Sequence, residues 1–382
     1  METCRKCIIP DSYPDITFED GLCAFCRMHE RSPRLNKSPL GRDKLLEKLT
    51  SKPIEKYHCV VALSGGKDSS YVLLHLVKEL GLRPLAVCVD SGYMSYDALA
   101  NVRRICETLS VDLVIHKSRF RWKLAREAFR IWQIRGECFT PCMPCELSNR
   151  SVAINQALRQ NIPFIVWGAS DYEEEAPTFL EPESLTFRQR YASKVDTSGM
   201  TLYARLKRFV MADMGFGHIH GALKSSMPLR KKLKTAYHMA MYLYYSLRNN
   251  LDVSAPEGWR RYLPIVETSF ENKGIEPVYF FDYVDYNPSE HIETLRREVG
   301  WKAPVAKETR LDCRVHAIIA YKHLKETGIT SEGFTYSVLV RHGLLSREEA
   351  AEKEEIFSRD LKKDCEQVLA GFGIDDKEGV IV

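Results

Sequence analysis

The stretch "VVALSGGKDSS", residues 60–70, carries an apolar, β-branched run directly into a serine, two glycines, a lysine and an aspartate. The run predicts a buried strand, and the following residues, KDSSYVLLHLVKEL, predict an amphipathic helix that ends at Gly81. Adjacent glycines let a backbone approach an anion closely, and a helix N-terminus presents unpaired N–H groups with partial positive charge. The junction therefore predicts a phosphate-binding loop. It differs from the G-x4-G-K-[ST] loop because its two glycines are adjacent.

Three more apolar runs follow, at residues 83–90, 111–116 and 162–168, with helical patterns between them. Continuous apolar strands that alternate with helices predict an α/β fold with a doubly wound parallel sheet, covered on both faces. Ligands of such sheets bind beyond the carboxyl ends of the strands, where SGGKDS lies. We expect three parts: a zinc-binding knuckle and linker over residues 1–42, the α/β domain over 43–175, and a largely helical, substrate- or partner-binding region over 176–382.

Composition indicates an ordinary globular chain. Of its 382 residues 45% are hydrophobic and 28% charged, and the net charge of +4 is too small to indicate a nucleic-acid-binding protein. No run approaches the roughly 20 apolar residues that span a bilayer, and METCRKC lacks the apolar core of a signal peptide. We therefore expect a cytoplasmic protein without a membrane partner, whose twelve cysteines are reduced thiols and candidate ligands.

Four cysteines near the N-terminus have the spacing C-x2-C-x15-C-x2-C: Cys4, Cys7, Cys23 and Cys26. Two such pairs fold onto one tetrahedral ion, and the segment between them has too few apolar residues for a core of its own. We expect a structural Zn²⁺ site, in which the metal supplies the folding energy. Four protein ligands close the coordination shell, so this zinc should not be catalytic.

The hexapeptide SGGKDS resembles the signature of the PP-loop ATP pyrophosphatases, which have a HUP-like α/β fold and split ATP into AMP and pyrophosphate. The resemblance implies that the loop holds the β- and γ-phosphates, with Lys67, Ser64 and Asp68 as catalytic residues. The whole phosphate-binding set would be Ser64, Gly65, Gly66, Lys67, Asp68 and Ser69. By the same resemblance, the end of the second strand would line the ribose or adenine with Val89, Asp90 and Ser91, although Asp90 can equally cap a loop.

The order of motifs along the chain resembles the N-acetyl sugar amidotransferases, which make surface polysaccharides such as lipopolysaccharide. The motifs read CRKCIIPD, FEDGLCAFC, SGGKDS, CMPC, LDC and RHGLLSREEA. Members of that family use ATP, and ammonia from a separate glutaminase, to convert the acetamido group of an N-acetyl sugar into an acetamidino group. The resemblance implies a nucleotide-linked sugar as acceptor and a glutaminase subunit as partner. A resident glutaminase would need its own nucleophilic cysteine and histidine partner, for which the chain has no room.

Carboxylates follow the fourth strand in WGASDYEEE, residues 167–175. They are candidates to hold the Mg²⁺ that accompanies ATP, although acidic runs are usually solvated. The family commonly has G-E-N-P-x-x-E here. This chain keeps Gly168 and Glu174 and has Ala169 and Ser170 in place of the glutamate and asparagine, so the resemblance does not identify its acceptor.

A second cysteine group comprises the CxxC pair Cys142 and Cys145, with Cys138 upstream and Cys313 far along the chain. Thiolating enzymes of the same superfamily bind a [4Fe–4S] cluster with such a pair and one remote cysteine, which favours Cys142, Cys145 and Cys313 as cluster ligands. A second zinc, with His316 or Cys138 as the fourth ligand, and plain buried thiols are the other interpretations. An ATP-dependent sulfurtransferase, acting on tRNA or a small carbonyl compound, is thus the alternative function.

The remaining patterns are weaker. Basic stretches such as MPLRKKLK stand beside several tyrosines, and we favour a charged helix over an RNA-binding surface. The segment AYHMAMYLYYSL, residues 236–247, predicts a buried or partner-facing helix. Asn287 or Ser289 is expected to cap a helix, and Ser346 with Glu349 forms an expected capping box.

Overall fold

The computed structural model describes residues 2–14, 16–31, 38–117, 119–135, 142–170, 172, 228–253, 274–303, 313–376 and 381. Its centre is a parallel five-stranded sheet in the order β5-β4-β3-β6-β7. The strands are β3 (Cys59–Ala62), β4 (Pro84–Asp90), β5 (Leu113–Lys117), β6 (Phe164–Trp167) and β7 (Glu276–Tyr279). The predicted α/β fold with a parallel sheet is confirmed.

The order of the strands creates a switch point beside β3. The chain leaves β3 for β4 and β5 on one side, then returns to β6 on the other side. The connections after β3 and after β6 therefore diverge at the carboxyl edge of the sheet, and crevices at such points are where open α/β sheets bind ligands. SGGKDS is the connection after β3.

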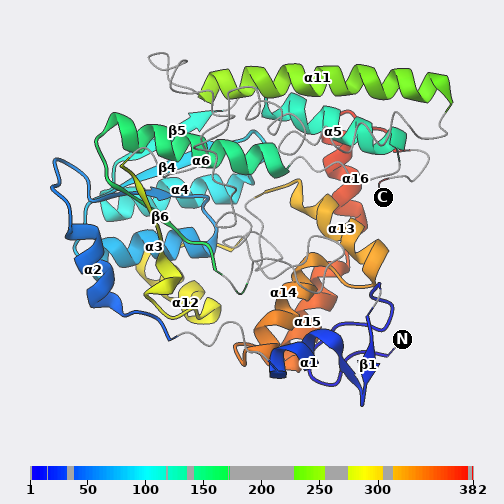
Figure 1. Ribbon diagram of the computed structural model, residues 1–382, viewed down its shortest axis with the longest axis horizontal. Coiled ribbons are helices and arrows are strands. Elements are labelled where there is room, and N and C mark those ends of the chain that lie inside the picture. Colours follow the sequence, from blue (N-terminus) through cyan, green and yellow to red (C-terminus); the bar gives the residue numbers. More distant parts are fainter. Residues whose placement is uncertain are drawn as a thin grey trace, which may run out of the picture.

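Helices cover both faces of the sheet (Figure 1). One face carries α3 (Lys67–Lys78), α4 (Tyr96–Leu109) and α12 (Pro288–Val299). The other carries α6 (Cys142–Arg159), over which lie α5 (Arg121–Arg135) and α11 (Leu229–Val253). Alternate residues of β3 serve the two layers, because Val61 packs toward α3 and Val60 toward α6, and both are fully buried. This explains why the strand is apolar without alternation.

Residues far along the chain complete the sheet domain. Strand β7, the 3₁₀ turn Phe280–Asp282 and α12 all come from the region that the sequence analysis separates from the α/β domain at residue 175. Helix α2 (Arg42–Thr50) begins where the linker was expected to end and adds Leu45 and Leu49 to the same core.

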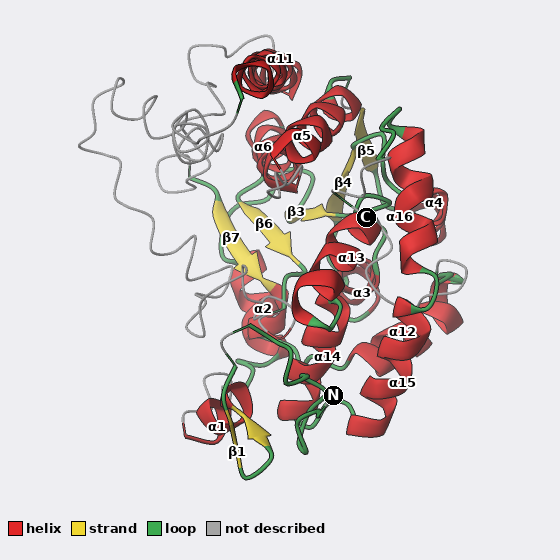
Figure 2. Cartoon of the chain, turned by 90° about the vertical axis from the view of Figure 1, so that its right-hand side faces the viewer, coloured by secondary structure: helices red, strands yellow, loops and turns green. Residues whose placement is uncertain are grey.

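The N-terminal module packs against the C-terminal helices (Figures 1 and 2). It contains the hairpin β1 (Phe18–Glu19) and β2 (Leu22–Cys23), followed by α1 (Ala24–Arg31). Its partners are α14 (Ser331–Arg341) and α15 (Arg347–Ser358). Helices α13 (His316–Thr327) and α16 (Leu361–Gly371) continue that layer and share a core with α5. The C-terminal helices thus connect the cysteine-rich module to the sheet domain.

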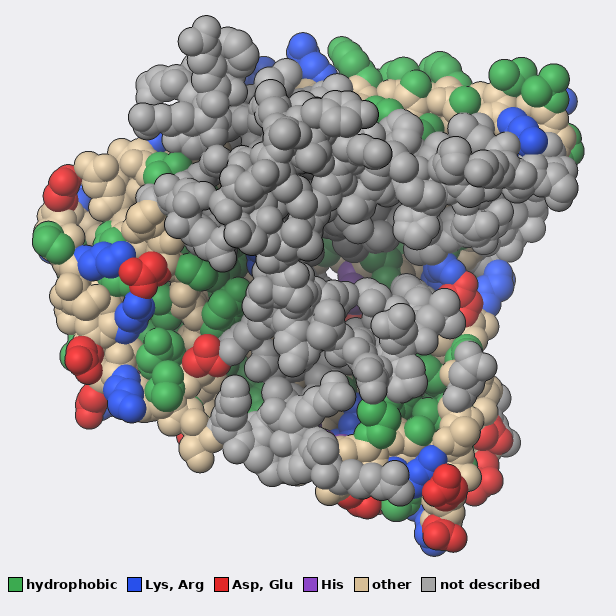
Figure 3. Space-filling model, viewed as in Figure 1, with side chains coloured by type: hydrophobic (Ala, Val, Ile, Leu, Met, Phe, Trp, Pro, Cys, Tyr) green, Lys and Arg blue, Asp and Glu red, His purple; other side chains and the backbone are tan. Residues whose placement is uncertain are grey.

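Helix α11 includes the predicted helix at residues 236–247. It buries Met239, Tyr242 and Tyr245 against α5, while Tyr237 and Tyr244 are exposed. Apolar side chains gather along the edge that it forms in the space-filling view (Figure 3). Within the described part of the chain, no helix combines the length and apolar character that a bilayer crossing requires.

Candidate functional site

The SGGKDS loop joins β3 to α3 at the switch point. Helix α3 begins at Lys67, and its N-cap is Gly66, which offers no side chain to the first N–H groups of the helix. A helix that starts without a side-chain cap keeps those donors available for an anion. The local geometry has the features that the sequence predicts for a phosphate-binding loop.

Two glycines allow close backbone packing at this loop. Gly65 has a φ of 81°, and a Cβ there would lie 2.2 Å from the carbonyl oxygen of Ala98 in α4. Gly168, just after β6, lies against the start of α3, since a Cβ on it would stand 3.1 Å from the Ser69 nitrogen. The structure therefore brings together the loop and Gly168, which was predicted to share the nucleotide site with it.

The loop serines hold its backbone in place. The hydroxyls of Ser64 and Ser69 lie 3.1 Å apart, and Ser69 Oγ also accepts the Ser64 N–H at 3.2 Å. The Gly66 N–H donates to Ser64 Oγ at 3.3 Å. These short-range bonds give the loop a defined shape, as electrostatic stabilisation by preorganised donors requires.

The charged pair of the loop is largely buried. Lys67 Nζ donates to Asp68 Oδ2 at 2.8 Å, and the two side chains are only 13% and 15% exposed. Asp68 Oδ1 and the hydroxyl of Ser70 are buried without a hydrogen-bond partner. Buried polar atoms are rarely left unpaired, so their presence here favours a ligand-dependent arrangement.

The other residues predicted to line the nucleotide site belong to the end of β4 or follow β4 and β6 in the chain. Val89 and Asp90 end β4, beside β3 in the sheet, and Ser91 is buried just beyond them. Asp90 Oδ1 accepts the N–H of Gly92 at 2.9 Å, so Asp90 caps its own turn. Glu174, the expected Mg²⁺ ligand, lies outside the described residues.

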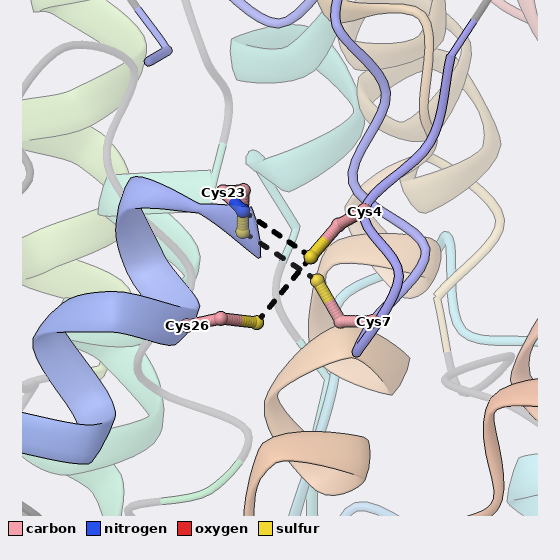
Figure 4. Close-up of side chains that lie close together, drawn as sticks. All are labelled: Cys4, Cys7, Cys23 and Cys26. Atoms are coloured by element: carbon pink, nitrogen blue, oxygen red, sulfur yellow. Dashed lines mark hydrogen bonds between the residues drawn. The ribbon is translucent and has the colours of Figure 1, made fainter. Parts of the chain in front are cut away.

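The four N-terminal cysteines converge on one point (Figure 4). Their sulfur atoms all lie within 4.8 Å of one another, and all four residues are fully buried. The Sγ atoms are 3.7 Å apart in the Cys4–Cys26 pair and in the Cys7–Cys23 pair. A tetrahedron with Zn–S bonds of about 2.3 Å has sulfur–sulfur edges of about 3.8 Å. The cluster can hold a metal ion, and the donor set suits zinc or an iron–sulfur centre.

Two arginines of the C-terminal motif RHGLLSREEA contact this cluster. Arg341 Nη1 lies 4.0 Å from Cys7 Sγ, while Arg347 Nε donates to the carbonyl oxygens of Cys4 and Cys7 at 3.1 and 3.2 Å. Positive charge beside ionised sulfur offsets the negative charge that four thiolates bring to a divalent ion. Hydrogen bonding from the Cys23 thiol also lowers the pKa of Cys4. The motif thus has a structural role beside the cysteine cluster.

The second cysteine group is partly assembled. Cys142 begins α6, and its side chain lies outside the described part of the structure. Cys313 forms a β-bridge with Met94, and the Arg314 N–H donates to the Tyr93 carbonyl at 2.8 Å. Cys145 packs in the same cluster and contacts the Tyr93 side chain. Burial raises the pKa of Tyr93, and the neighbouring sulfur atoms of Cys145 and Cys313 raise it further. The fold therefore brings these two thiols to one place.

Arg121 lies beside that place and was not anticipated from the sequence. Its side chain is fully buried and donates to the Cys145 carbonyl at 3.1 Å, while its Nε and Nη1 have no hydrogen-bond partner. A buried guanidinium is costly to desolvate and favours anions and thiolates nearby. The residues around Arg121 in the sequence form no pattern that predicts its burial beside Cys145. His316, weighed as a zinc ligand, contacts Glu332 through Nε2.

Comparison with known proteins is limited. No protein-family model matches the chain. An uncharacterized protein of Methanocaldococcus jannaschii is 33% identical to it over 145 residues, which are 37% of this chain and 50% of that protein. The chain thus spans about half the length of the curated relative that it matches. Because that protein is uncharacterized, the similarity does not indicate an activity.

Proposed function

We propose that this protein is an AMP-forming ATP pyrophosphatase of the PP-loop type. The observation that carries the proposal is the position of SGGKDS at the switch point, with an uncapped helix start and Lys67 in the same loop. Helix N–H groups and one ammonium suit the terminal phosphates of a nucleotide. The hydroxyl of Ser70, which is buried without a hydrogen-bond partner, adds a polar atom that a bound ligand would satisfy.

We further propose that the acceptor is the acetamido group of a nucleotide-linked N-acetyl sugar. The amide oxygen attacks the α-phosphorus of ATP, the bond to the β-phosphate oxygen breaks, and pyrophosphate leaves. Ammonia from a separate glutaminase then attacks the activated carbon, loses a proton, and AMP departs with the former amide oxygen. Lys67 would neutralise charge on the departing pyrophosphate, while Ser64 and Asp68 hold the loop and Lys67 in position. Mg²⁺ would accompany the phosphates.

The four N-terminal cysteines are proposed to bind structural zinc. Their complete enclosure and closed four-sulfur set support a folding role rather than a place in the reaction. The contacts of Arg341 and Arg347 with the cluster support the same assignment.

A second candidate function is ATP-dependent sulfur transfer. The approach of Cys145 and Cys313 to Tyr93, with the buried charge of Arg121 beside them, favours an anionic sulfur centre there. Cys142, Cys145 and Cys313 would then hold a [4Fe–4S] cluster, as in the thiolating relatives. Iron and acid-labile sulfide in anaerobically purified protein would distinguish this candidate from the first.

The deciding experiment measures the products of ATP turnover. Protein is incubated with Mg-ATP, a panel of nucleotide-linked acetamido sugars, and either ammonium, glutamine with a glutaminase, or sulfide. The proposal expects AMP and pyrophosphate in equal amounts, formed only with an acceptor and with ammonia. Formation of ADP and phosphate would overturn the pyrophosphatase assignment, and an acceptor that takes sulfur rather than nitrogen would favour the second candidate.

A further inference from the structure

His291, on α12, lies directly behind the SGGKDS loop. It is 1% exposed, and its ring stacks on Tyr71 with centroids 3.8 Å apart and planes at 21°. Phe281 lies nearly parallel to the same ring at 5.4 Å. A ring of α3 and a ring of the 3₁₀ turn Phe280–Asp282 therefore both pack against the imidazole. This packing fixes the orientation of the His291 ring relative to the loop.

Hydrogen bonding assigns the position of the proton on this ring. Nε2 accepts the N–H of Asn287 at 3.3 Å, so a neutral His291 carries its proton on Nδ1. Nδ1 is buried without a hydrogen-bond partner and lies 3.9 Å from Asp68 Oδ1, which is likewise buried and unpartnered. A movement of about 1 Å would bring this donor and acceptor to hydrogen-bonding distance.

Asp68 connects this pair to the cation of the loop. Its Oδ2 accepts from Lys67 Nζ at 2.8 Å, while its Oδ1 faces His291. We propose that His291 is a positioning residue, whose Nδ1–H holds Asp68 and, through it, the Lys67 ammonium against the phosphates. This inference rests on the proposed function of the loop. It assigns both oxygens of Asp68 to positioning Lys67.

The arrangement has a mechanical reason. A phosphate that attracts Lys67 also pulls on the carboxylate that holds it, and a carboxylate bound at one oxygen only can rotate with the lysine. A donor on the second oxygen opposes that rotation. Displacement of a catalytic group by about 1 Å can cost on the order of 100-fold in rate. His291 should therefore affect the chemical step more than nucleotide binding.

Two variants separate hydrogen bonding from packing. His291→Phe keeps a ring between Tyr71 and Phe281 but removes the donor, whereas His291→Asn offers an amide N–H close to the position of Nδ1. We expect His291→Phe to lower kcat for AMP formation about 10- to 100-fold with less than about a threefold change in the KM for ATP. His291→Asn should recover most of that loss. Full activity of His291→Phe, or equal losses in both variants, would overturn the proposal.

A spectroscopic arm tests the pair without turnover. In protein with ¹⁵N-labelled histidine, the resonances that disappear in His291→Phe belong to residue 291. They should show a proton on Nδ1, and they should shift in Asp68→Asn but not in the matched control Asp97→Asn on α4. A proton on Nε2, or no response to Asp68→Asn, would refute the pairing even if the wild-type protein formed AMP. If no AMP forms with any acceptor, the proposed function fails, while these spectra still decide the pairing.

Discussion

Trp301 donates its indole N–H to the carbonyl oxygen of Gly65 at 3.0 Å, although 236 residues separate the two. The same glycine also lies close to the Ala98 carbonyl of α4. The loop therefore contacts two segments besides β3 and α3, which flank it: helix α4 and the residues just after α12. The shape of the loop therefore depends on the packing of the sheet domain. Substitutions at these contacts should change the stability of the protein.

Gly65→Ala should destabilise the protein more than Gly92→Ala. Both glycines have a φ of 81°, so an added methyl strains the backbone equally, by about 1–2 kcal/mol. A Cβ at Gly92 meets nothing within 4 Å, whereas at Gly65 it collides with the Ala98 carbonyl. The collision should add about 1–3 kcal/mol. Urea unfolding of both variants measures the difference, and equal losses would contradict the described packing.

Lys67→Ala should abolish AMP formation, with at least about a 100-fold loss, while the fold survives. Alanine is well tolerated at the first position of α3, so the effect should be electrostatic. Lys78→Ala, at the exposed end of the same helix, is the control and should keep full activity. Circular dichroism checks the fold and chromatography of nucleotides the turnover. Normal turnover in Lys67→Ala would remove the basis of the phosphate-loop assignment.

Cys4→Ser should cost the protein about one zinc per chain and the fold of its N-terminal module, because the metal supplies much of the folding free energy there. Cys106→Ser changes a buried thiol outside the cluster and should retain the metal. Metal analysis of both purified proteins, with protease sensitivity as a second readout, makes the comparison. Unchanged metal content in Cys4→Ser would show that the four sulfur atoms do not act together.

Arg347→Ala should lower the free energy of unfolding by about 1–3 kcal/mol, since it leaves the carbonyl oxygens of Cys4 and Cys7 without their side-chain donor. It should also speed release of the metal to a chelator. Arg359→Ala removes an exposed pair with Glu355 and should change stability by less than about 1 kcal/mol. Equal stability and equal rates of metal release in the two variants would contradict the idea that Arg347 stabilises the N-terminal module.

Glu354 should make stability depend on pH. Burial raises the pKa of this carboxyl from 4.5 to about 7. Between those values the folded protein binds more protons than the unfolded chain, so stability should fall as pH rises, by about 3 kcal/mol in all. Glu354→Gln preserves contacts with Thr330 without the charge, and should match wild type near pH 4.5 but exceed it at pH 8. Glu355→Gln is an exposed control, and parallel pH profiles for all three proteins would contradict this prediction.

Local signals in the sequence were reliable. The apolar runs became β3, β4, β5 and β6, and the adjacent glycines lie where the loop needs them. The expected caps are also confirmed: the Asn287 side chain caps α12, and Ser346 with Glu349 forms a capping box at α15. Each of these depends on residues within a few positions of one another, so spacing alone reveals them.

Contacts between distant segments were not predictable. Strand β7 has only four residues, one of them Pro277, and its pairing with β6 joins parts of the chain that no short pattern relates. The approach of Arg121 to Cys145 and of His291 to Asp68 likewise arises only when helices pack. Arg341 lies beside Cys7 for the same reason, although the two residues are 334 positions apart. These side chains acquire their roles from tertiary structure.

The hydrogen bonds from Arg347 to the N-terminal module have a consequence for biosynthesis. Cys7 and the Arg347 side chain that bonds its carbonyl are 340 positions apart. At about 5–20 residues per second, a ribosome needs roughly 17–70 s to cover that distance. Throughout that interval the nascent module lacks its packing against the C-terminal helices, so it depends on its own short-range bonds and on the proposed metal, and its thiols stay open to oxidation if no metal is captured. Metal supply during translation, rather than after release, should therefore limit the yield of functional protein.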